Sequence, residues 1–320
     1  MEITKREIGE ALRYFETYFA AELQSNTPLM SRVMQYLQQR KGKQMRPMFV
    51  LLCARLGGEL NPRSYRAALL VELLHTASLV HDDMVDDATE RRGAWSVNAL
   101  WNSRASVMAG DYLFAKGMLL SLSNEDHRIL EIYAAAIGDM IESELLQLTK
   151  SRKPDLTEPT YYNIIRAKTA SFLAAACAAG ASSTFTDPET INLVHRFGEK
   201  AGMAFQVKDD LFDYGEESVG KPVGNDIKEK KITLPLIYTL DTATPALRKK
   251  ILYIVNHRNK DKDAVAEVVQ LVRNNGGMQY AEEKMLAYKQ EALALLYTFP
   301  ASGTRDALEE LVSYITDRSY

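Results

Sequence analysis

Apolar residues recur at helical spacing along most of this chain. Near the N-terminus, Ile8, Leu12, Phe15 and Phe19 are three or four positions apart, which places them on one face of a helix. Short clusters of Pro, Gly, Asn, Asp and Ser interrupt the pattern, and we expect turns at 25–28, 57–58, 61–62, 123–126, 153–155, 186–188, 244–245 and 299–300. No segment repeats at a fixed period. The pattern predicts an all-α fold in a single domain, residues 1–320, with little or no sheet.

The composition agrees with a large helical core. Of the 320 residues, 46% are hydrophobic, and Gly and Pro are few, at 17 and 10 residues. The formal net charge is −3, with both signs scattered along the chain, which argues against nucleic acid as a partner. Cys53 and Cys177 lie in apolar segments without CxxC spacing, as expected of buried thiols in a reducing compartment.

The sequence gives no sign of export or of a membrane span. The first seven residues are too charged for a signal peptide. The longest uncharged stretch, 169–186, consists mostly of Ala, Ser, Thr and Gly, which gain too little in hydrocarbon to span a bilayer. We therefore expect a soluble, cytoplasmic protein.

Two acidic clusters each follow an apolar helical pattern. They comprise Asp82, Asp83 and Asp86, and Asp209, Asp210 and Asp213. In each cluster the first and last Asp are four residues apart and share a helix face, so their charges repel unless a cation compensates them. One such cluster alone could equally be a solvated helix face or an N-cap. Two matching clusters favour Mg²⁺ sites that use substrate phosphates as further ligands.

Further motifs accompany these clusters in a fixed order. Gly42-Lys43-Gln44-Met45-Arg46-Pro47 comes first, Arg91-Arg92-Gly93 follows the first cluster, and Gln206 precedes the second. In this combination the chain resembles the all-trans isoprenyl (polyprenyl) diphosphate synthases of the medium- or long-chain type, from about residue 25 to about residue 240. The resemblance implies a large helical bundle around a deep central cavity, usually in a homodimer, with the two aspartate motifs facing each other across its mouth.

The resemblance also implies a prenyltransferase of isoprenoid biosynthesis, which joins isopentenyl diphosphate head-to-tail to an allylic diphosphate. Three Mg²⁺ ions would neutralise charge on the departing diphosphate, so that the allylic C–O bond can break to a carbocation. By the same resemblance, Asp82, Asp86 and Asp209 are the metal ligands, and the other three aspartates, Asp83, Asp210 and Asp213, support catalysis around them. No side-chain base is nominated, because the released diphosphate would accept the proton.

Basic residues at family positions are expected to hold the two diphosphates. Lys43, Arg46 and Arg92 match positions that bind isopentenyl diphosphate, and arginine offers forked donors for phosphate oxygens. His75 precedes Asp82 by seven residues, two helical turns or roughly 10 Å along the same face, and matches a polar donor to that diphosphate. His81 is expected to be structural.

A second set matches positions around the allylic diphosphate: Arg91, Lys168, Thr169, Gln206, Lys221 and Lys231. Lys168 is also a catalytic candidate. The last two belong to the stretch 214–233, where glycines among lysines predict a mobile functional loop that excludes water on closing. An ordinary solvated charge is the alternative for each, above all for the two loop lysines. Lys230 stands where the family pattern would place a glycine, which we expect to stiffen the loop.

The residues one turn before Asp82 are expected to control product length. Ser78 is four residues before Asp82, roughly 6 Å deeper on the same stripe, so a bulky residue there would block the growing chain. Ala77 and Ser78 are small and resemble the residues of synthases that make long chains for quinone tails. A geranylgeranyl or farnesyl diphosphate synthase and a non-catalytic subunit of a heteromeric synthase are the alternatives. We also expect transient membrane association during product release.

Overall fold

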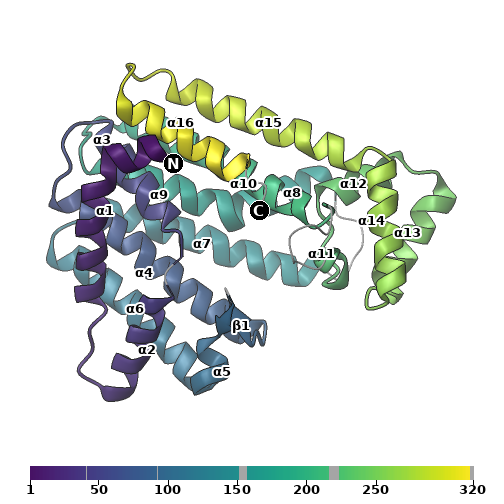
Figure 1. The fold of residues 1–320 in the computed structure, drawn as a ribbon, viewed down its shortest axis with the longest axis horizontal. Helices are drawn as coiled ribbons and strands as arrows, with labels where there is room; N and C mark the ends of the chain where they lie inside the picture. The colour runs from purple at the N-terminus through teal and green to yellow at the C-terminus, as the bar shows by residue number, and fades with distance from the viewer. Residues whose placement is uncertain (41, 92, 151–156, 216–222, 318–320) are drawn as a thin grey trace. The chain divides into compact units, whose positions relative to one another are not determined.

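A computed structural model of the chain describes residues 1–40, 42–91, 93–150, 157–215 and 223–317, with the backbone alone described for 146–150. Helices joined by short turns make up most of this part (Figure 1). The first of them are α1 (Glu2–Glu22), α2 (Pro28–Gln39), α3 (Met45–Arg55), α4 (Pro62–Val85), α5 (Val97–Trp101), α6 (Ser103–Ser123), α7 (His127–Lys150) and α8 (Glu158–Ile165). A π-helical turn, η1 (Arg166–Ala170), leads into α9 (Ser171–Ser182) and α10 (Pro188–Phe212). The chain continues with α11 (Asn225–Lys228), α12 (Leu234–Thr242), α13 (Pro245–His257), α14 (Lys262–Asn274), α15 (Gly277–Leu296) and α16 (Gly303–Thr316).

The prediction of an all-α fold is confirmed. Within the described residues the only strands are β1 (Glu90–Arg91) and β2 (Ala94–Trp95), which form a two-stranded antiparallel hairpin. This hairpin follows α4 directly and returns the chain towards the end of that helix. It therefore matters for the first aspartate cluster and not for the core.

The chain divides into two compact units, each assembled from three segments. The first contains Met1–Ala134, Ala175–His195 and Phe299–Glu310, and the second contains Ala135–Ala174, Arg196–Thr298 and Leu311–Tyr320. The first aspartate cluster belongs to the first unit and the second cluster to the second. The single domain expected from the sequence stays a prediction.

Helix α4 is the central element of the first unit. Its N-terminus is fixed by a capping box, in which the Asn61 side chain accepts from the backbone N–H of Ser64 and the Ser64 hydroxyl accepts from that of Asn61, while Pro62 occupies the first turn. In the middle of α4, apolar residues occupy all sides of the helix, and residues 67–71 are fully buried. α4 packs against α3 and α6 (Figure 1). At the C-terminal end of the helix Asp82 and Asp86 are exposed, so the first aspartate cluster reaches the surface there.

The second unit is built around the C-terminal half of α10 and the helices α12 to α15. Buried residues of α8, α10, α12 and α15 form one apolar cluster, which includes Tyr161, Val207, Leu234 and Met285. A Cβ atom on Gly202 of α10 would lie only 2.6 Å from the Cα of Ala170 in η1. A side chain at position 202 would therefore separate the two backbones, and the glycine explains how α10 and η1 can lie so close together.

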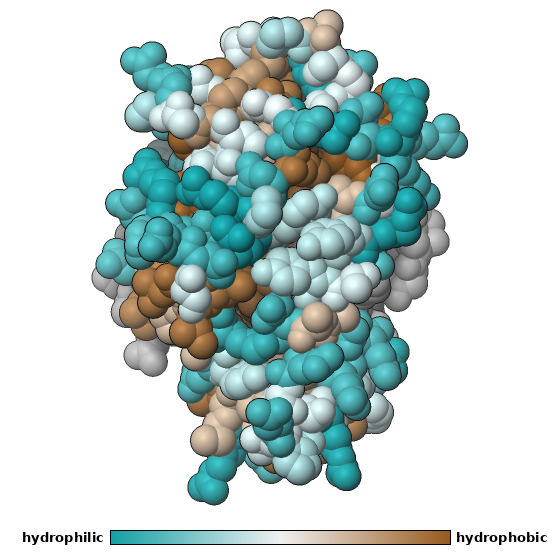
Figure 2. Space-filling model, turned by 90° about the vertical axis from the view of Figure 1, so that its left-hand side faces the viewer, coloured by the Kyte–Doolittle hydropathy of each residue, from teal (hydrophilic) through white to brown (hydrophobic). Residues whose placement is uncertain are grey.

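Apolar residues also reach the surface. On the face seen in Figure 2, hydrophobic patches interrupt a mostly hydrophilic surface. The exposed large apolar residues include Val107, Met108, Met118, Leu119 and Leu122, all on α6. One helical stretch, Glu158–Ser182, is long and apolar enough to cross a membrane by length and composition, but 72% of its most apolar window is buried within the protein, as in a core helix.

Candidate active site

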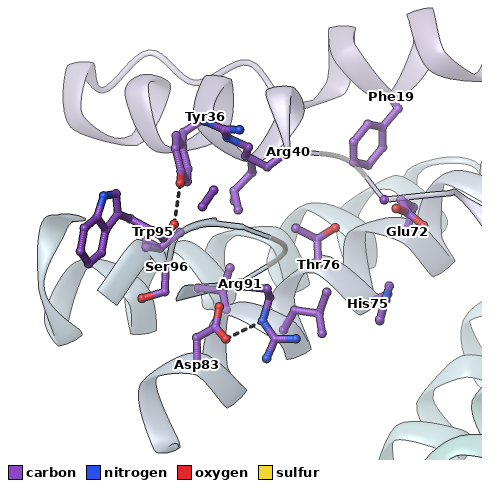
Figure 3. Close-up of a pocket in the computed structure, with 16 residues that line it drawn as sticks. Phe19, Tyr36, Arg40, Glu72, His75, Thr76, Asp83, Arg91, Trp95 and Ser96 are labelled. Carbon is purple, nitrogen blue, oxygen red and sulfur yellow. Dashed lines mark hydrogen bonds and ion pairs between the residues drawn. The ribbon is translucent and has the colours of Figure 1, made fainter. Parts of the chain in front are cut away.

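The first aspartate cluster occupies the last turn of α4 and its C-cap. Asp82 and Asp86 are exposed, and the backbone N–H of Asp86 donates to the carbonyl of Asp82 at 2.8 Å, so the two residues stay one helical turn apart. Asp83 faces the other way and is only 4% exposed. Arg91, carried back by the hairpin, donates from Nε to Oδ1 of Asp83 at 2.5 Å (Figure 3). The outward pair can meet a ligand, whereas Asp83 holds Arg91.

Two residues predicted to bind isopentenyl diphosphate meet in the first unit. Nη1 of Arg46, in the first turn of α3, lies 3.0 Å from Nε2 of His75 on α4. Arginine can only donate, so Nε2 accepts, and the ring is neutral with its proton on Nδ1. A donor role for His75 would therefore fall to Nδ1. Lys43 is exposed just before α3, and Arg92 lies outside the described residues.

A pocket in the first unit lies beside these residues. Its lining, drawn in Figure 3, combines apolar side chains with charged ones, among them Arg40, Glu72, His75, Asp83 and Arg91. One wall is held by the hydroxyl of Tyr36, which donates to the carbonyl of Trp95 at 2.5 Å. The sequence did not single out Arg40, Tyr36 or Trp95. Tyr36 and the C-cap residue Arg40 belong to α2, whereas Trp95 belongs to the hairpin, and only the packing of α2 against the hairpin region brings them to one pocket.

The second aspartate cluster ends α10 and contains a buried hydrogen-bond network. Asp210 is 5% exposed and accepts from the Tyr161 hydroxyl at 2.6 Å and from Nε2 of Gln206 at 3.0 Å. The hydroxyl of Thr169 donates to Oε1 of Gln206 at 2.9 Å. Asp209 points to a less buried position on the neighbouring side of the helix. The structure thus brings together Thr169, Gln206 and Asp210, and adds Tyr161, which sequence reasoning missed.

The cations predicted for the allylic diphosphate lie in different settings. Lys168 is in η1 and forms an ion pair with Glu144. Lys231 follows α11, is exposed, and lies 2.5 Å from Oε2 of Glu229. Arg91 is the residue held by Asp83. Lys221 lies outside the described residues. π-Helical turns are rare and often occur at functional sites, which suits the position of Lys168 and Thr169.

Asp213 organises the segment that follows α10. Its two carboxylate oxygens accept from the backbone N–H groups of Asn225 and Asp226, at 2.8 and 3.0 Å, and so fix the start of α11. Burial raises the pKa of Asp213, because the effect of these two bonds is smaller. Lys230, where a glycine was expected, adopts a left-handed φ of 58°. A non-glycine residue is strained in this region.

Buried carboxylates crowd together at the end of α10. Burial raises the pKa of Asp210 to about 7; hydrogen bonds from Tyr161 and Gln206 lower it, and the negative charges of Asp226 and Asp209 raise it. Burial, followed by the charge of Asp213, also raises the pKa of Asp226 to about 7. Sequence analysis did not select Asp226, although it belongs to the stretch predicted as a functional loop. Such crowding is relieved by a bound cation.

The two residues predicted to control product length differ in burial. Ala77 is fully buried in the core around α4. Ser78 is half-buried, and its hydroxyl donates to the carbonyl of Leu74 at 3.1 Å, so its only polar group is satisfied within the helix. A larger side chain could therefore be placed at position 78 with less disturbance of the core than at position 77.

Comparison with known proteins decides the family. The polyprenyl synthetase family model matches residues 27–272. The chain belongs to the polyprenyl synthetase family. It is a prenyltransferase of isoprenoid biosynthesis, as the ordered motifs predicted. The match includes both aspartate clusters and every basic residue singled out above.

Relatives of this polyprenyl synthetase cover nearly its whole length. Heptaprenyl diphosphate synthase component 2 of Geobacillus stearothermophilus is 32% identical over 98% of this chain and 97% of its own. Octaprenyl diphosphate synthase of Escherichia coli (strain K12) is 31% identical over 93% of this chain and 92% of its own.

Solved structures agree in fold. Polyprenyl synthase from Caulobacter crescentus CB15, complexed with calcium and isoprenyl diphosphate, superimposes with a TM-score of 0.91 at 32% identity, covering 100% of this chain and 98% of the other. Geranylgeranyl pyrophosphate synthase from Bacteroides thetaiotaomicron superimposes with a TM-score of 0.85 at 34% identity, covering 99% and 98%. Both likenesses support the all-α fold expected of an isoprenoid synthase.

The donor chemistry of this polyprenyl synthetase fits a hard divalent cation. Carboxylate oxygens are the protein ligands that Mg²⁺ prefers, and it takes only one or two of them beside water and substrate phosphates. Within the described residues, no group of three or more His, Cys, Asp or Glu side chains is close enough together to hold a metal ion. Each cluster alone therefore offers a partial site of the kind that diphosphate oxygens would complete.

Proposed function

We propose that this polyprenyl synthetase condenses isopentenyl diphosphate with an allylic diphosphate, in the presence of Mg²⁺, to give an all-trans polyprenyl diphosphate of medium or long chain. The observation that carries the proposal is the family match over 27–272 in a chain that retains both complete aspartate clusters. A subunit that had lost the chemistry would not need six aspartates at these spacings.

The aspartate clusters are assigned to the allylic diphosphate. Asp82, Asp86 and Asp209 would hold Mg²⁺, in three ions per active site, and the exposure of the first two supports this role. When bound, Mg²⁺ supplies charge neutralisation for the departing diphosphate. Asp83, Asp210 and Asp213 keep the neighbouring residues in place through the hydrogen bonds described above. The similar polyprenyl synthase from Caulobacter crescentus CB15, whose structure contains calcium and isoprenyl diphosphate, supports the use of a divalent metal.

The basic residues are assigned to two groups. Lys43, Arg46, His75 and Arg92 would bind isopentenyl diphosphate, and the contact between Arg46 and His75 supports a common site. Arg91, Lys168, Thr169, Gln206, Lys221 and Lys231 would surround the allylic diphosphate. Arg91 gains a fixed direction from Asp83, so its guanidinium loses little side-chain entropy when a diphosphate binds.

A medium or long chain is the product length that we favour. Small residues at 77 and 78 support it, and two relatives have names that specify heptaprenyl and octaprenyl products. The alternative, a geranylgeranyl or farnesyl diphosphate synthase, is favoured by the likeness to a geranylgeranyl pyrophosphate synthase at 34% identity. Both products need the same diphosphate contacts and differ only in how far the tail can grow.

We further propose a cytoplasmic homodimer that contacts the membrane transiently when its apolar product is released. Five large apolar side chains are exposed on α6, and large exposed apolar patches often mark sites of protein or membrane contact. A second copy of α6 would cover them. The relative named as component 2 of a heptaprenyl diphosphate synthase makes a heteromer the alternative.

One assay tests the whole proposal. The purified chain alone is incubated with Mg²⁺, radiolabelled isopentenyl diphosphate and allylic primers of several lengths, and the products are sized by chromatography. We expect polyprenyl products longer than geranylgeranyl. Products that stop at 15 or 20 carbons would establish the short-chain alternative. No condensation without a second protein would establish the heteromeric alternative.

A further inference from the structure

Tyr161 stands out among the residues that the proposed chemistry does not use. Its ring is 3% exposed within the apolar cluster of the second unit, and its hydroxyl donates to Oδ2 of Asp210 at 2.6 Å. Nε2 of Gln206 donates to the other oxygen of Asp210 at 3.0 Å. Both oxygens of this carboxylate are therefore bound by protein donors, and the direction of the carboxylate is fixed.

The network has a defined polarity. In its ionised form the Asp210 carboxylate only accepts hydrogen bonds, so the amide nitrogen of Gln206 then faces Asp210. The amide oxygen then faces Thr169, whose hydroxyl donates to it at 2.9 Å. The hydrogen bonds thus link Thr169 of η1 to Gln206 of α10, and Gln206 to Asp210 of the same helix. Asp210 also accepts from the hydroxyl of Tyr161 in α8. Three helical segments are joined at one point.

Residues assigned to the allylic diphosphate lie next to members of this network. Asp209 precedes Asp210 in α10, and Lys168 precedes Thr169 in η1. A rotation of the last turn of α10 would move the carboxylate of Asp209, and a shift of η1 would move the ammonium of Lys168. Residues that orient a ligand's neighbours typically affect metal affinity strongly without touching the metal.

We propose that Tyr161 is a positioning residue for the second aspartate cluster, acting through Asp210; this inference rests on the proposed role of Asp209 as a Mg²⁺ ligand. Gln206 alone would leave one oxygen of Asp210 without its buried donor. The carboxylate could then turn, and the end of α10 would lose its link to α8. Tyr161 would thus orient the carboxylate of Asp210 and the end of α10 without itself binding substrate.

Tyr161→Phe tests this role, because it removes the hydroxyl and keeps the ring in the apolar cluster. Isothermal titration with Mg²⁺ and inorganic diphosphate would measure binding without turnover. We expect the apparent dissociation constant to rise about 10- to 100-fold, as for other residues that support metal ligands. In steady-state assays, we expect a higher half-saturating Mg²⁺ concentration and an unchanged KM for isopentenyl diphosphate.

Tyr162→Phe is the matched control. Tyr162 is adjacent in α8 and packs edge-on against Tyr161 with 5.4 Å between ring centroids, whereas the hydroxyl that donates to Asp210 is that of Tyr161. We expect wild-type binding of Mg²⁺ and diphosphate in this variant. If Tyr161→Phe lowers thermal stability but leaves the Mg²⁺ dependence and the dissociation constant at their wild-type values, Tyr161 is only structural and the inference is wrong.

Asp209→Asn separates this inference from the proposed function. Loss of Mg²⁺-diphosphate binding in Asp209→Asn, together with wild-type binding in Tyr161→Phe, would overturn the inference alone. Wild-type binding and turnover in Asp209→Asn would instead overturn the assignment of Asp209, and with it the premise on which the role of Tyr161 depends.

Discussion

Asp83 accepts a 2.5 Å hydrogen bond from Nε of Arg91 and is buried, although its neighbours Asp82 and Asp86 are exposed. Asp210 occupies the same middle position of the second cluster and is likewise buried. It accepts two hydrogen bonds, from Tyr161 and Gln206. In both clusters the middle aspartate faces inward and organises its surroundings. The first aspartate faces a more accessible position, where a metal ion could be bound.

This division predicts that two neighbouring substitutions affect different properties, one the catalytic rate and the other the stability. Asp82→Asn removes a charge from an exposed position, so we expect kcat to fall about 10²- to 10³-fold, as for loss of one transition-state contact, with little change in thermal stability. Asp83→Asn weakens a buried ion pair, and we expect a loss of about 1–3 kcal/mol in the free energy of unfolding. Steady-state kinetics and urea unfolding would measure both. Equal stability losses in the two variants would contradict this division.

Ser78 offers a direct test of product length. Ser78→Phe places a bulky ring roughly one helical turn, about 6 Å, from Asp82 along α4, where it would obstruct a growing chain. We expect shorter products, with the rate of the first condensation largely kept. Ser78→Ala is the control, because it removes the hydroxyl bonded to Leu74 without adding bulk, and its products should match those of the wild type. An unchanged product distribution in Ser78→Phe would show that the chain grows elsewhere.

The helices that carry the clusters were predictable, whereas the partners of the clusters were not. Apolar periodicity and the Asn61-Pro62 start signal indicate α4, and the spacing of Asp82 and Asp86 follows from the helix itself. The bond from Tyr161 to Asp210 depends on how α8 packs on α10, which period and propensity do not encode. Tyr161 also has the spacing of an ordinary core residue, so its hydroxyl carried no signal.

The loop after α10 shows the same limit. Glycines and lysines marked it as functional, and Asp226 was part of that stretch, yet the raised pKa of Asp226 arises from burial beside Asp213. That Asp213 fixes the start of α11 through two backbone N–H groups could not be inferred from a spacing of twelve and thirteen residues. Lys230 stands where the family pattern would place a glycine, and its φ of 58° lies in the left-handed region that a glycine adopts without strain.

Gly202 predicts how sensitive the second cluster is to packing. In Gly202→Ala the new Cβ would lie 2.6 Å from the Cα of Ala170, so η1 and α10 must separate. We expect a loss of about 1–3 kcal/mol in the free energy of unfolding, as for other overpacked sites. Because Thr169 would move away from Gln206, we also expect the KM for the allylic primer to rise more, relative to the wild type, than the KM for isopentenyl diphosphate.

Gly138 provides the control for this substitution. It lies inside α7, and a Cβ there would meet no atom within 4 Å. Gly138→Ala should therefore stabilise the protein by about 0.5–1 kcal/mol through helix propensity alone, with unchanged kinetics. If Gly202→Ala behaved in the same way as Gly138→Ala, the close approach of η1 to α10 would have no importance for the site.

Glu310 predicts a pH-dependent contribution to the stability of the first unit. Its carboxylate accepts from the backbone N–H groups of Ile3 and Thr4, at 3.2 and 2.8 Å, and from the Thr4 hydroxyl at 2.7 Å. These groups belong to the first turn of α1, whose N–H groups have no partner within the helix. Burial raises the pKa of Glu310, but the hydrogen bonds outweigh it and lower the pKa from 4.5 to about 2.

A depressed pKa in the folded state means that the unfolded chain takes up the proton first as the pH falls. The contribution of Glu310 is therefore complete above about pH 4.5 and declines as the pH falls towards 2. We expect Glu310→Gln to cost about 1–3 kcal/mol near neutral pH and progressively less at pH 4 and pH 3. Urea unfolding at each pH would measure the difference from the wild type. Glu309→Gln makes the same change of charge one residue earlier and should show no such trend; a cost of Glu310→Gln that stayed constant down to pH 3 would mean that its ionised form is not what holds α1.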